Sequence, residues 1–375
     1  MSVAGTEVLD PDDGATLDKT HRQIRVCAIA FRLLQYLIFL SAFRYGGGSA
    51  LASFCLIISS LVSTLMHEAG HAIAARAVGW RVVVFAVWPV SVRLTSWSIG
   101  FEKLGSGTDH LGWVKTIPSR PDKDTCRNWS TILAAGPATS LVVAVAAFFF
   151  AVAWLPKWNT PNISMSTIGF GFALGCLASF VFNLLPNAWS HHKTDGDQIR
   201  AMADPAYDYH KGRALIWLGT LVSANVRPRE RPSWLLDAAR SDHADNYEIA
   251  KLLDSTKLAS LLDTFEIDPN AARAGIEGYR QKYGADDWLT AIDAYVTVCY
   301  DREPEAADAI LAGWPRPKTP TPMFVAAEAA VAAANGRHEE AKDRLRAMMK
   351  LVRAQSTFRD DTFRDIHRQI RKLAA

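Results

Sequence analysis

Long apolar runs dominate the first half of the chain, whereas charged and apolar positions are mixed in the second half. Four runs are long enough for helices that cross a bilayer, which requires about 20 residues. A soluble core seldom needs four such runs so close together, so the pattern favours transmembrane helices over the buried helices of a soluble protein. The predicted spans are residues 26–43, 50–78, 131–154 and 168–185.

A different pattern separates the second and third runs. The stretch "RVVVFAVWPVSVRLTSWSIGFEKLG" is rich in valine, tryptophan and threonine and is interrupted by Pro89 and by glycines. Such composition is typical of short strands rather than of a helix. "HLGWVKTIP" follows as a further candidate strand. We therefore expect a small β-sheet insertion at about residues 81–117.

The second half predicts short helices. "RPRERPSW" reads as a proline-punctuated connection, and alanine and leucine then recur at helical spacing from residue 235 onward. Two segments align at an offset of 35 residues, with Ala306 on Ala341 and Ile310 on Leu345. This offset is close to the period of tetratricopeptide-like helical hairpins. Two units are few for a stacked repeat, so an irregular helical domain is the alternative.

The fold class predicted from these patterns is a polytopic α-helical membrane protein. It has about four transmembrane helices with a small β-sheet insertion, followed by an all-α cytoplasmic domain. The N-terminus is acidic and rich in turn-forming residues, which favours disorder, and it lacks the basic start and cleavage site of a signal peptide. The predicted boundaries are residues 1–20 for the disordered N-terminus, 21–200 for the transmembrane domain, 201–234 for a linker and 235–375 for the helical domain.

Charge decides the orientation and excludes one class of partner. Lysine and arginine concentrate before the first run, between the second and third runs and after the fourth. By the positive-inside rule, both termini and the long middle segment face the cytoplasm. The net charge of +3, without a basic stripe carrying interleaved aromatics, gives no support for binding nucleic acid. The five cysteines form no CxxC pair, so neither a disulfide framework nor a cysteine-zinc site is expected.

The second run carries polar residues that suggest a metal site. In "HEAGH", His67 and His71 stand four residues apart and therefore share one face of a helix. Two imidazoles at this spacing can bind one zinc ion, and Glu68 can accept a proton from a water whose pKa zinc lowers to roughly 7. Coincidence is the alternative, but ionisable groups within a membrane span usually mark function.

A zinc site of this kind needs a third protein ligand. The fourth run ends in "FNLLPNAWSHHKTDGDQI", which places Asp195 at the same, cytoplasmic end as the two histidines. Its carboxylate suits the third position. His191 and His192 are rivals because imidazole is an equally good zinc ligand, and Asp197 is a weaker one.

This set of residues resembles the site-2 protease family of intramembrane zinc metalloproteases over about residues 26–200. "HEAGH" is similar to its HExxH motif, and "NLLP" followed by "TDG" is similar to its asparagine, proline and Asp-Gly signature. "GWVK" and "AAGPATS" resemble two softer segments. The sequence departs from the family in having Ser140 where many members have asparagine, and in the nine positions from Pro186 to Asp195, where many have a tighter gap.

The resemblance implies roles for particular residues. His67, His71 and Asp195 would bind zinc, Glu68 would be the general base, and Asn183 would lie near the metal and position the substrate or the developing oxyanion. The implied activity is a zinc-dependent intramembrane endopeptidase, by family analogy a protein of the bacterial inner membrane. Its partners would be the lipid bilayer, a membrane protein or membrane-bound peptide as substrate, and a protein bound by the C-terminal domain.

Three further expectations concern function. Cleavage of a helical substrate requires local unwinding, and an exposed strand edge at residues 82–92 could pair with the unwound backbone. A membrane-tethered helical scaffold or sensor with a structural or degenerate metal site is the main alternative, although such a site has no use for Glu68. A transporter is disfavoured because the chain shows no repeated halves.

Overall fold

The structure is a computed structural model of the 375-residue chain. It describes residues 48–95, 97–101, 111–153, 165–184, 194–204, 206–210, 212–224, 226–265, 267–355 and 361–374, together with 33, 36 and 37. The predicted disordered N-terminus at residues 1–20 and nearly all of the predicted first span at residues 26–43 lie outside the described residues. The chain divides into two compact units, Met1–Val92 with Phe101–Tyr209, and Arg93–Gly100 with His210–Ala375.

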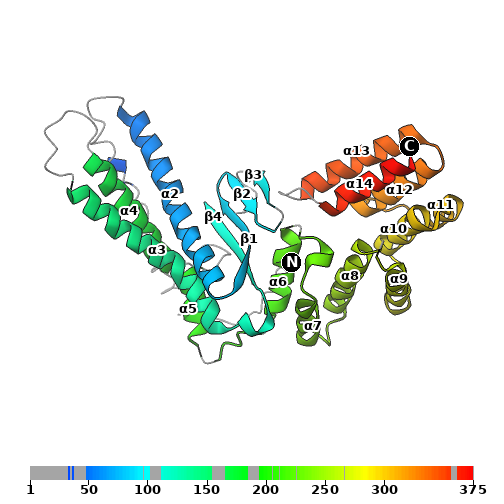
Figure 1. The fold of residues 1–375 in the computed structure, drawn as a ribbon, viewed down its shortest axis with the longest axis horizontal. Helices are drawn as coiled ribbons and strands as arrows, with labels where there is room; N and C mark the ends of the chain where they lie inside the picture. Colours follow the sequence, from blue (N-terminus) through cyan, green and yellow to red (C-terminus); the bar gives the residue numbers. More distant parts are fainter. Residues whose placement is uncertain are drawn as a thin grey trace, which may run out of the picture. The chain divides into compact units, whose positions relative to one another are not determined.

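Three long apolar helices make up most of the described part of the first unit (Figure 1). They are α2 (Gly48–Ala77), α3 (Cys126–Ala153) and α4 (Met165–Leu184). Among the described residues, these three helices are long and apolar enough to cross a membrane. Small residues let them approach closely, since a Cβ on Gly70 would lie 2.5 Å from the Ala135 carbonyl oxygen of α3.

The outer faces of these helices are apolar and uncovered by protein. Phe148, Phe149 and Phe150 of α3 are all exposed, the middle one by 64%. On α2, Ile73 is exposed by 69%, only two residues from the buried His71. Large apolar side chains in such positions are costly in water and favourable in lipid, so the helices carry their polar residues inward and their apolar residues outward.

A four-stranded sheet connects α2 to α3 and confirms the predicted β insertion. Its strands are β1 (Trp80–Val87), β2 (Val90–Arg93), β3 (Ser98–Phe101) and β4 (Gly112–Pro118), in the order β3-β2-β1-β4. β1 and β4 are antiparallel, with Trp80 opposite Pro118 and a bulge between Val82 and Val84.

The prediction that residues 82–92 form an exposed sheet edge is wrong. β1 lies between β2 and β4, and β2 lies between β3 and β1, so the hydrogen-bonding groups of both strands face neighbours on two sides. The edges of the described sheet are β3 and β4. The error arose because β4 returns from a distant part of the chain to cover the side of β1 that the local sequence leaves open.

One short element attaches the sheet to the start of α3, and another follows α4. The 3-10 turn η1 (Pro121–Lys123) precedes α3, and its Lys123 carbonyl accepts hydrogen bonds from Trp80 Nε1 and Asn128 Nδ2, both at 2.8 Å. The Trp80 ring stacks on Trp129 of α3. α5 (Asp195–Met202) follows α4 and packs on α3.

The second unit is helical over its described C-terminal part, and α6 falls within the stretch predicted to be a linker. Proline or an N-capping side chain marks the start of several of these helices, as at Asp268, Asp286 and Thr321. The elements are α6 (Arg213–Ser223), η3 (Pro228–Glu230), α7 (Ser233–Asp242), α8 (Tyr247–Asp263), α9 (Pro269–Tyr283), α10 (Asp287–Val296), η4 (Thr297–Asp301), α11 (Pro304–Ala312), α12 (Pro322–Ala334), α13 (His338–Gln355) and α14 (Asp361–Leu373).

The suspected repeat aligns the residues of α11 with those of α13. The burial of the aligned residues does not follow the predicted offset of 35 residues. Ala306 is exposed whereas its aligned partner Ala341 is buried. The neighbouring Ala307 is fully buried and packs in the same core cluster as Ala341. Equivalent positions are therefore 34 residues apart (341 − 307), and the repeat itself stays a prediction.

Candidate metal centre

The three polar residues of "HEAGH" lie near the C-terminal end of α2 and are buried. His67, Glu68 and His71 are exposed by 4%, 8% and 8%. The surrounding residues are good helix formers, so the helix continues through the motif to Ala77. Helical geometry then puts the two imidazole rings one turn apart on the same face, with centroids separated by 4.8 Å.

Three potential ligand atoms converge at this point. Asp195, the first residue of α5, places Oδ2 at 3.2 Å from His67 Nε2 and at 3.2 Å from His71 Nε2. The two Nε2 atoms are themselves 3.1 Å apart. Ligand bonds of about 2.0–2.1 Å in a tetrahedral zinc site put neighbouring ligand atoms about 3.3 Å apart. The triangle of donor atoms therefore has the size that such an ion requires.

The contacts of the two Nδ1 atoms indicate which ring nitrogens carry a proton and which carry a lone pair. His71 Nδ1 lies 2.7 Å from the Ile132 carbonyl oxygen and must donate its proton there, so the Nε2 of the neutral ring carries a lone pair. His67 Nδ1 lies 3.1 Å from Ser140 Oγ. Asp195 Oδ2 is buried and accepts no well-formed hydrogen bond from the described residues.

Lone pairs that face one another in a buried site repel unless a cation lies between them. Two imidazole nitrogens and a carboxylate oxygen are a donor set that zinc commonly takes, with a fourth position left for water or substrate. The residues present therefore fit a zinc ion.

Two glycines of the softer motifs lie against the site. A Cβ on Gly136 of "AAGPATS" would overlap the His71 ring and come within 2.9 Å of His67 Nε2. A Cβ on Gly112 of "GWVK" would lie 2.9 Å from Glu68 Cγ. Both positions need glycine because the backbone passes directly over a side chain of this cluster. Small residues such as Gly136 let membrane helices approach closely, and here the approach brings α3 against both imidazoles.

A third glycine and a helix cap place Asp195. A Cβ on Gly196 would overlap the Leu184 carbonyl group, so the start of α5 packs directly on the last turn of α4. Thr194 caps α5, since its Oγ1 accepts from the Asp197 N–H at 3.1 Å while Asp197 Oδ2 accepts from the Thr194 N–H at 3.0 Å. The capping box fixes the first residue of the helix and so aims Asp195 at the histidines.

The other candidate residues have different positions. Asp197 is engaged in the capping box and is not part of the His67, His71 and Asp195 cluster. His191 and His192 lie outside the described residues. Asn183, on the last turn of α4, donates its amide to the Ser179 carbonyl oxygen at 2.8 Å. Its function near the metal stays a prediction.

Comparison with known proteins bears on the resemblance noted in the sequence. No curated protein and no solved structure matches the chain significantly. A family profile does match, that of peptidase family M50, over residues 54–360, which is more than half of the chain. The matched part includes α3, α4, most of α2 and the HEAGH motif. The chain therefore belongs to peptidase family M50, the site-2 protease family of membrane-embedded metalloproteases.

Proposed function

We propose that this protein is a zinc-dependent endopeptidase that hydrolyses peptide bonds in or near the transmembrane segments of other proteins. The observation that carries the proposal is the convergence of His67, His71 and Asp195 beside a buried glutamate at the end of an apolar helix. A merely structural metal site, as in a membrane-tethered scaffold, would have no use for that glutamate.

Each side chain has a separate task in this proposal. His67, His71 and Asp195 would hold zinc, which when bound polarises a carbonyl group and acidifies a water molecule. Glu68 accepts the proton of the attacking water and passes it to the leaving amine. The Ile132 carbonyl group and Ser140 orient the two imidazoles from behind. Asn183 would orient the substrate or receive the developing negative charge.

The substrate backbone must also find hydrogen-bond partners once its helix unwinds, because lipid offers none. β4 is an edge strand of the described sheet, and its first residue, Gly112, lies against Glu68. Pairing of an unwound substrate with β4 would bring its peptide bonds to the general base. The strand that we propose to pair with the substrate is therefore residues 112–118 rather than residues 82–92.

The surroundings of the enzyme follow from family analogy and charge. We place it in the bacterial inner membrane with both termini in the cytoplasm, as the distribution of lysine and arginine predicts. The helical second unit would recruit or gate the substrate. Removing residues 235–375 is then expected to change substrate choice or regulation, and an unchanged cleavage pattern would remove that role.

The test of the proposal is the substitution Glu68→Gln, which preserves shape and removes the base. Loss of general acid–base catalysis lowers rates by about 10²–10⁴-fold. Cleavage of a tagged single-span reporter protein by the purified enzyme is therefore expected to disappear, with zinc content and thermal stability unchanged. Cleavage by the variant at the wild-type rate would refute the mechanism, and loss of zinc would show that Glu68 serves the metal instead.

A further inference from the structure

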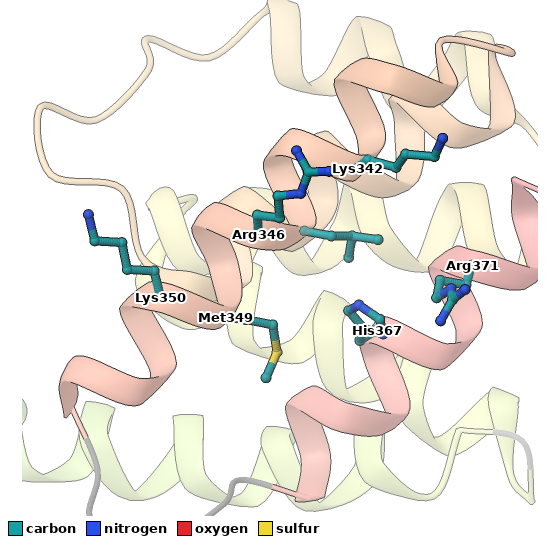
Figure 2. Close-up of a pocket in the computed structure, with 7 residues that line it drawn as sticks. Lys342, Arg346, Met349, Lys350, His367 and Arg371 are labelled. Carbon is teal, nitrogen blue, oxygen red and sulfur yellow. The ribbon is translucent and has the colours of Figure 1, made fainter.

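Outside the metal centre, the second unit has a basic groove between α13 and α14. Its volume is about 650 Å³, and an apolar floor of Leu345 and Met349 lies between basic side chains. Figure 2 shows that the labelled groups come from both helices and that Met349 and His367 point into the space between them. The basic lining residues are Lys342, Arg346 and Lys350 of α13 and His367 and Arg371 of α14.

None of the residues that line this groove is acidic. Lys342 and Arg346 each pair with an acidic residue three positions earlier on α13, at 2.6 and 2.9 Å. Both are exposed pairs, which contribute only about 0–1 kcal/mol and exchange readily. Lys350 and Arg371 are exposed and form no ion pair with the described residues. An anion in the groove would therefore meet several available cations.

The basic side chains affect the pKa of a histidine inside the groove. Burial lowers the pKa of the His367 imidazole, and the nearby Arg371 guanidinium lowers it further. Because these two effects act in the same direction, the ring is neutral at pH 7 and can donate or accept a hydrogen bond. An anion bound beside it would favour the protonated form and move the pKa of His367 upward.

A membrane surface is a poor match for this groove, although α14 resembles an amphipathic membrane-binding helix in sequence. Such helices bury their apolar face in lipid. The apolar face of α14 is already used, since Ile370 is fully buried in the core and Phe363 and Ile366 pack against the same cluster. The concave shape and apolar floor instead suit a chain of alternating acidic and apolar residues.

We propose that the groove between α13 and α14 binds an extended acidic peptide segment of a partner protein. The basic residues from Lys342 to Lys350 span eight helical positions, or about 12 Å, which matches about four residues of extended peptide. Acidic side chains of the peptide pair with the rim, and apolar side chains between them contact Leu345 and Met349. The proposal does not depend on proteolysis or on zinc.

The experiment uses the full-length protein in nanodiscs of zwitterionic lipid. Binding of a fluorescein-labelled peptide, Asp-Leu-Glu-Leu-Glu-Glu, is followed by anisotropy and compared with the amide counterpart, Asn-Leu-Gln-Leu-Gln-Gln. The wild type is expected to bind the acidic peptide and not the amide one. Lys350→Glu combined with Arg371→Glu is expected to weaken binding at least about tenfold, which corresponds to about 1.4 kcal/mol.

The matched control is Lys257→Glu combined with Lys318→Glu, which changes net charge equally at exposed residues that do not line the groove. It should bind within about twofold of the wild type, a change of under about 0.5 kcal/mol. Lys350→Ala with Arg371→Ala serves if the charge-reversed variant fails to fold. A second readout is the pKa of His367 by NMR, expected to rise when the acidic peptide is added.

Three results would overturn the proposal. The wild type could fail to bind the acidic peptide, or the groove variant could bind it as tightly as the wild type. Dihexanoyl phosphatidylserine, added below its micellar concentration, could displace the labelled peptide more effectively than the unlabelled peptide does. That last result would assign the groove to lipid headgroups. None of these outcomes bears on the metal centre, because no cleavage is measured.

Discussion

Two helices of nearly uniform apolar composition, α3 in the first unit and α12 in the second, meet their surroundings in opposite ways. Ten of the 13 residues of α12 are buried by the protein, mostly alanines that let neighbouring helices approach. Only seven of the 28 residues of α3 are buried, and its exposed face carries three phenylalanines. Apolar composition alone therefore does not identify a membrane span. A span is identified by its length and by an apolar face that no other part of the protein covers.

The comparison also explains where polar residues are allowed. In the first unit the buried ionisable side chains of α2, His67, Glu68 and His71, all belong to one site. In the second unit charges cover the outside and form exposed ion pairs, such as Lys342 with Glu339. Ionisable residues in lipid are costly, so the buried histidines and glutamate of α2 favour a functional site there.

The largest expected effect comes from placing a charge on each of the two apolar helices. Val331→Asp on α12, where valine is exposed by 1%, should unfold the helical unit because an unpaired buried carboxylate costs several kcal/mol. Limited proteolysis of the full-length protein would detect the loss as rapid digestion of residues 210–375.

Val142→Asp on α3 sharpens this comparison, since that valine is exposed by 67%. We expect the helical unit to stay resistant to protease while membrane insertion becomes less favourable by about 2.5–3.5 kcal/mol. Equal protease sensitivity of the two variants would mean that α12 and α3 do not differ in environment as described.

A smaller effect is expected when a methyl group is added to a helical glycine in each unit. In Gly136→Ala the new Cβ overlaps His71, and overpacking of about 1–3 kcal/mol would weaken zinc binding by up to about 150-fold. In Gly219→Ala of α6 the Cβ meets nothing within 4 Å, so a gain in stability of about 0.4–1 kcal/mol is expected. Competition with a zinc chelator measures the zinc affinity of Gly136→Ala, and thermal melts measure the stability of Gly219→Ala. Normal zinc affinity in Gly136→Ala would contradict the close approach of α3 to the imidazoles.

Removal of the hydroxyl behind His67 should have a moderate effect. Ser140→Ala leaves His67 Nδ1 without its partner at 3.1 Å, and loss of such an orienting group weakens metal binding by about tenfold or more. Ser140→Asn, which offers a side-chain amide at this position, is expected to restore the affinity. Chelator titration of the three proteins decides the matter, and an unchanged affinity in the alanine variant would leave Ser140 a packing role only.

The smallest effect is expected on the surface of the helical unit. Arg280→Ala breaks the pairs with Glu277 at 2.8 Å and with Asp293 at 2.6 Å, but the arginine side chain is 38% exposed, and such pairs contribute about 0–1 kcal/mol each. A shift in the denaturant midpoint much larger than this would show that charges hold the second unit together more than its apolar core does.

Much of this organisation could be predicted from the sequence because its signals are local. The HEAGH spacing places two imidazoles on one helix face, and valine-rich segments interrupted by proline predict strands. The capping role of Asp197 was also readable, since threonine followed three positions later by an acidic residue marks a helix start. The same signal argues against Asp197 as a metal ligand.

Other features could not be predicted because they depend on distant parts of the chain. The neighbour that covers β1 comes from residues 112–118, so the edge of the sheet is not visible in residues 82–92. The contacts of Gly136 with His71 and of Gly112 with Glu68 exist only in the folded chain, because these residues are far apart in the sequence. The approach of Asp195 to the histidines depends on Gly196 meeting the end of α4, which no spacing within the motif reveals.

The most direct test of the metal centre is the zinc content of the purified full-length protein, measured beside the His71→Ala and Asp195→Ala variants. The convergence of three donor atoms predicts stoichiometric zinc in the wild type and a large loss in both variants, with each variant still folded. Wild-type protein without zinc, or an Asp195→Ala variant that retains it fully, would contradict a site shared between α2 and α5.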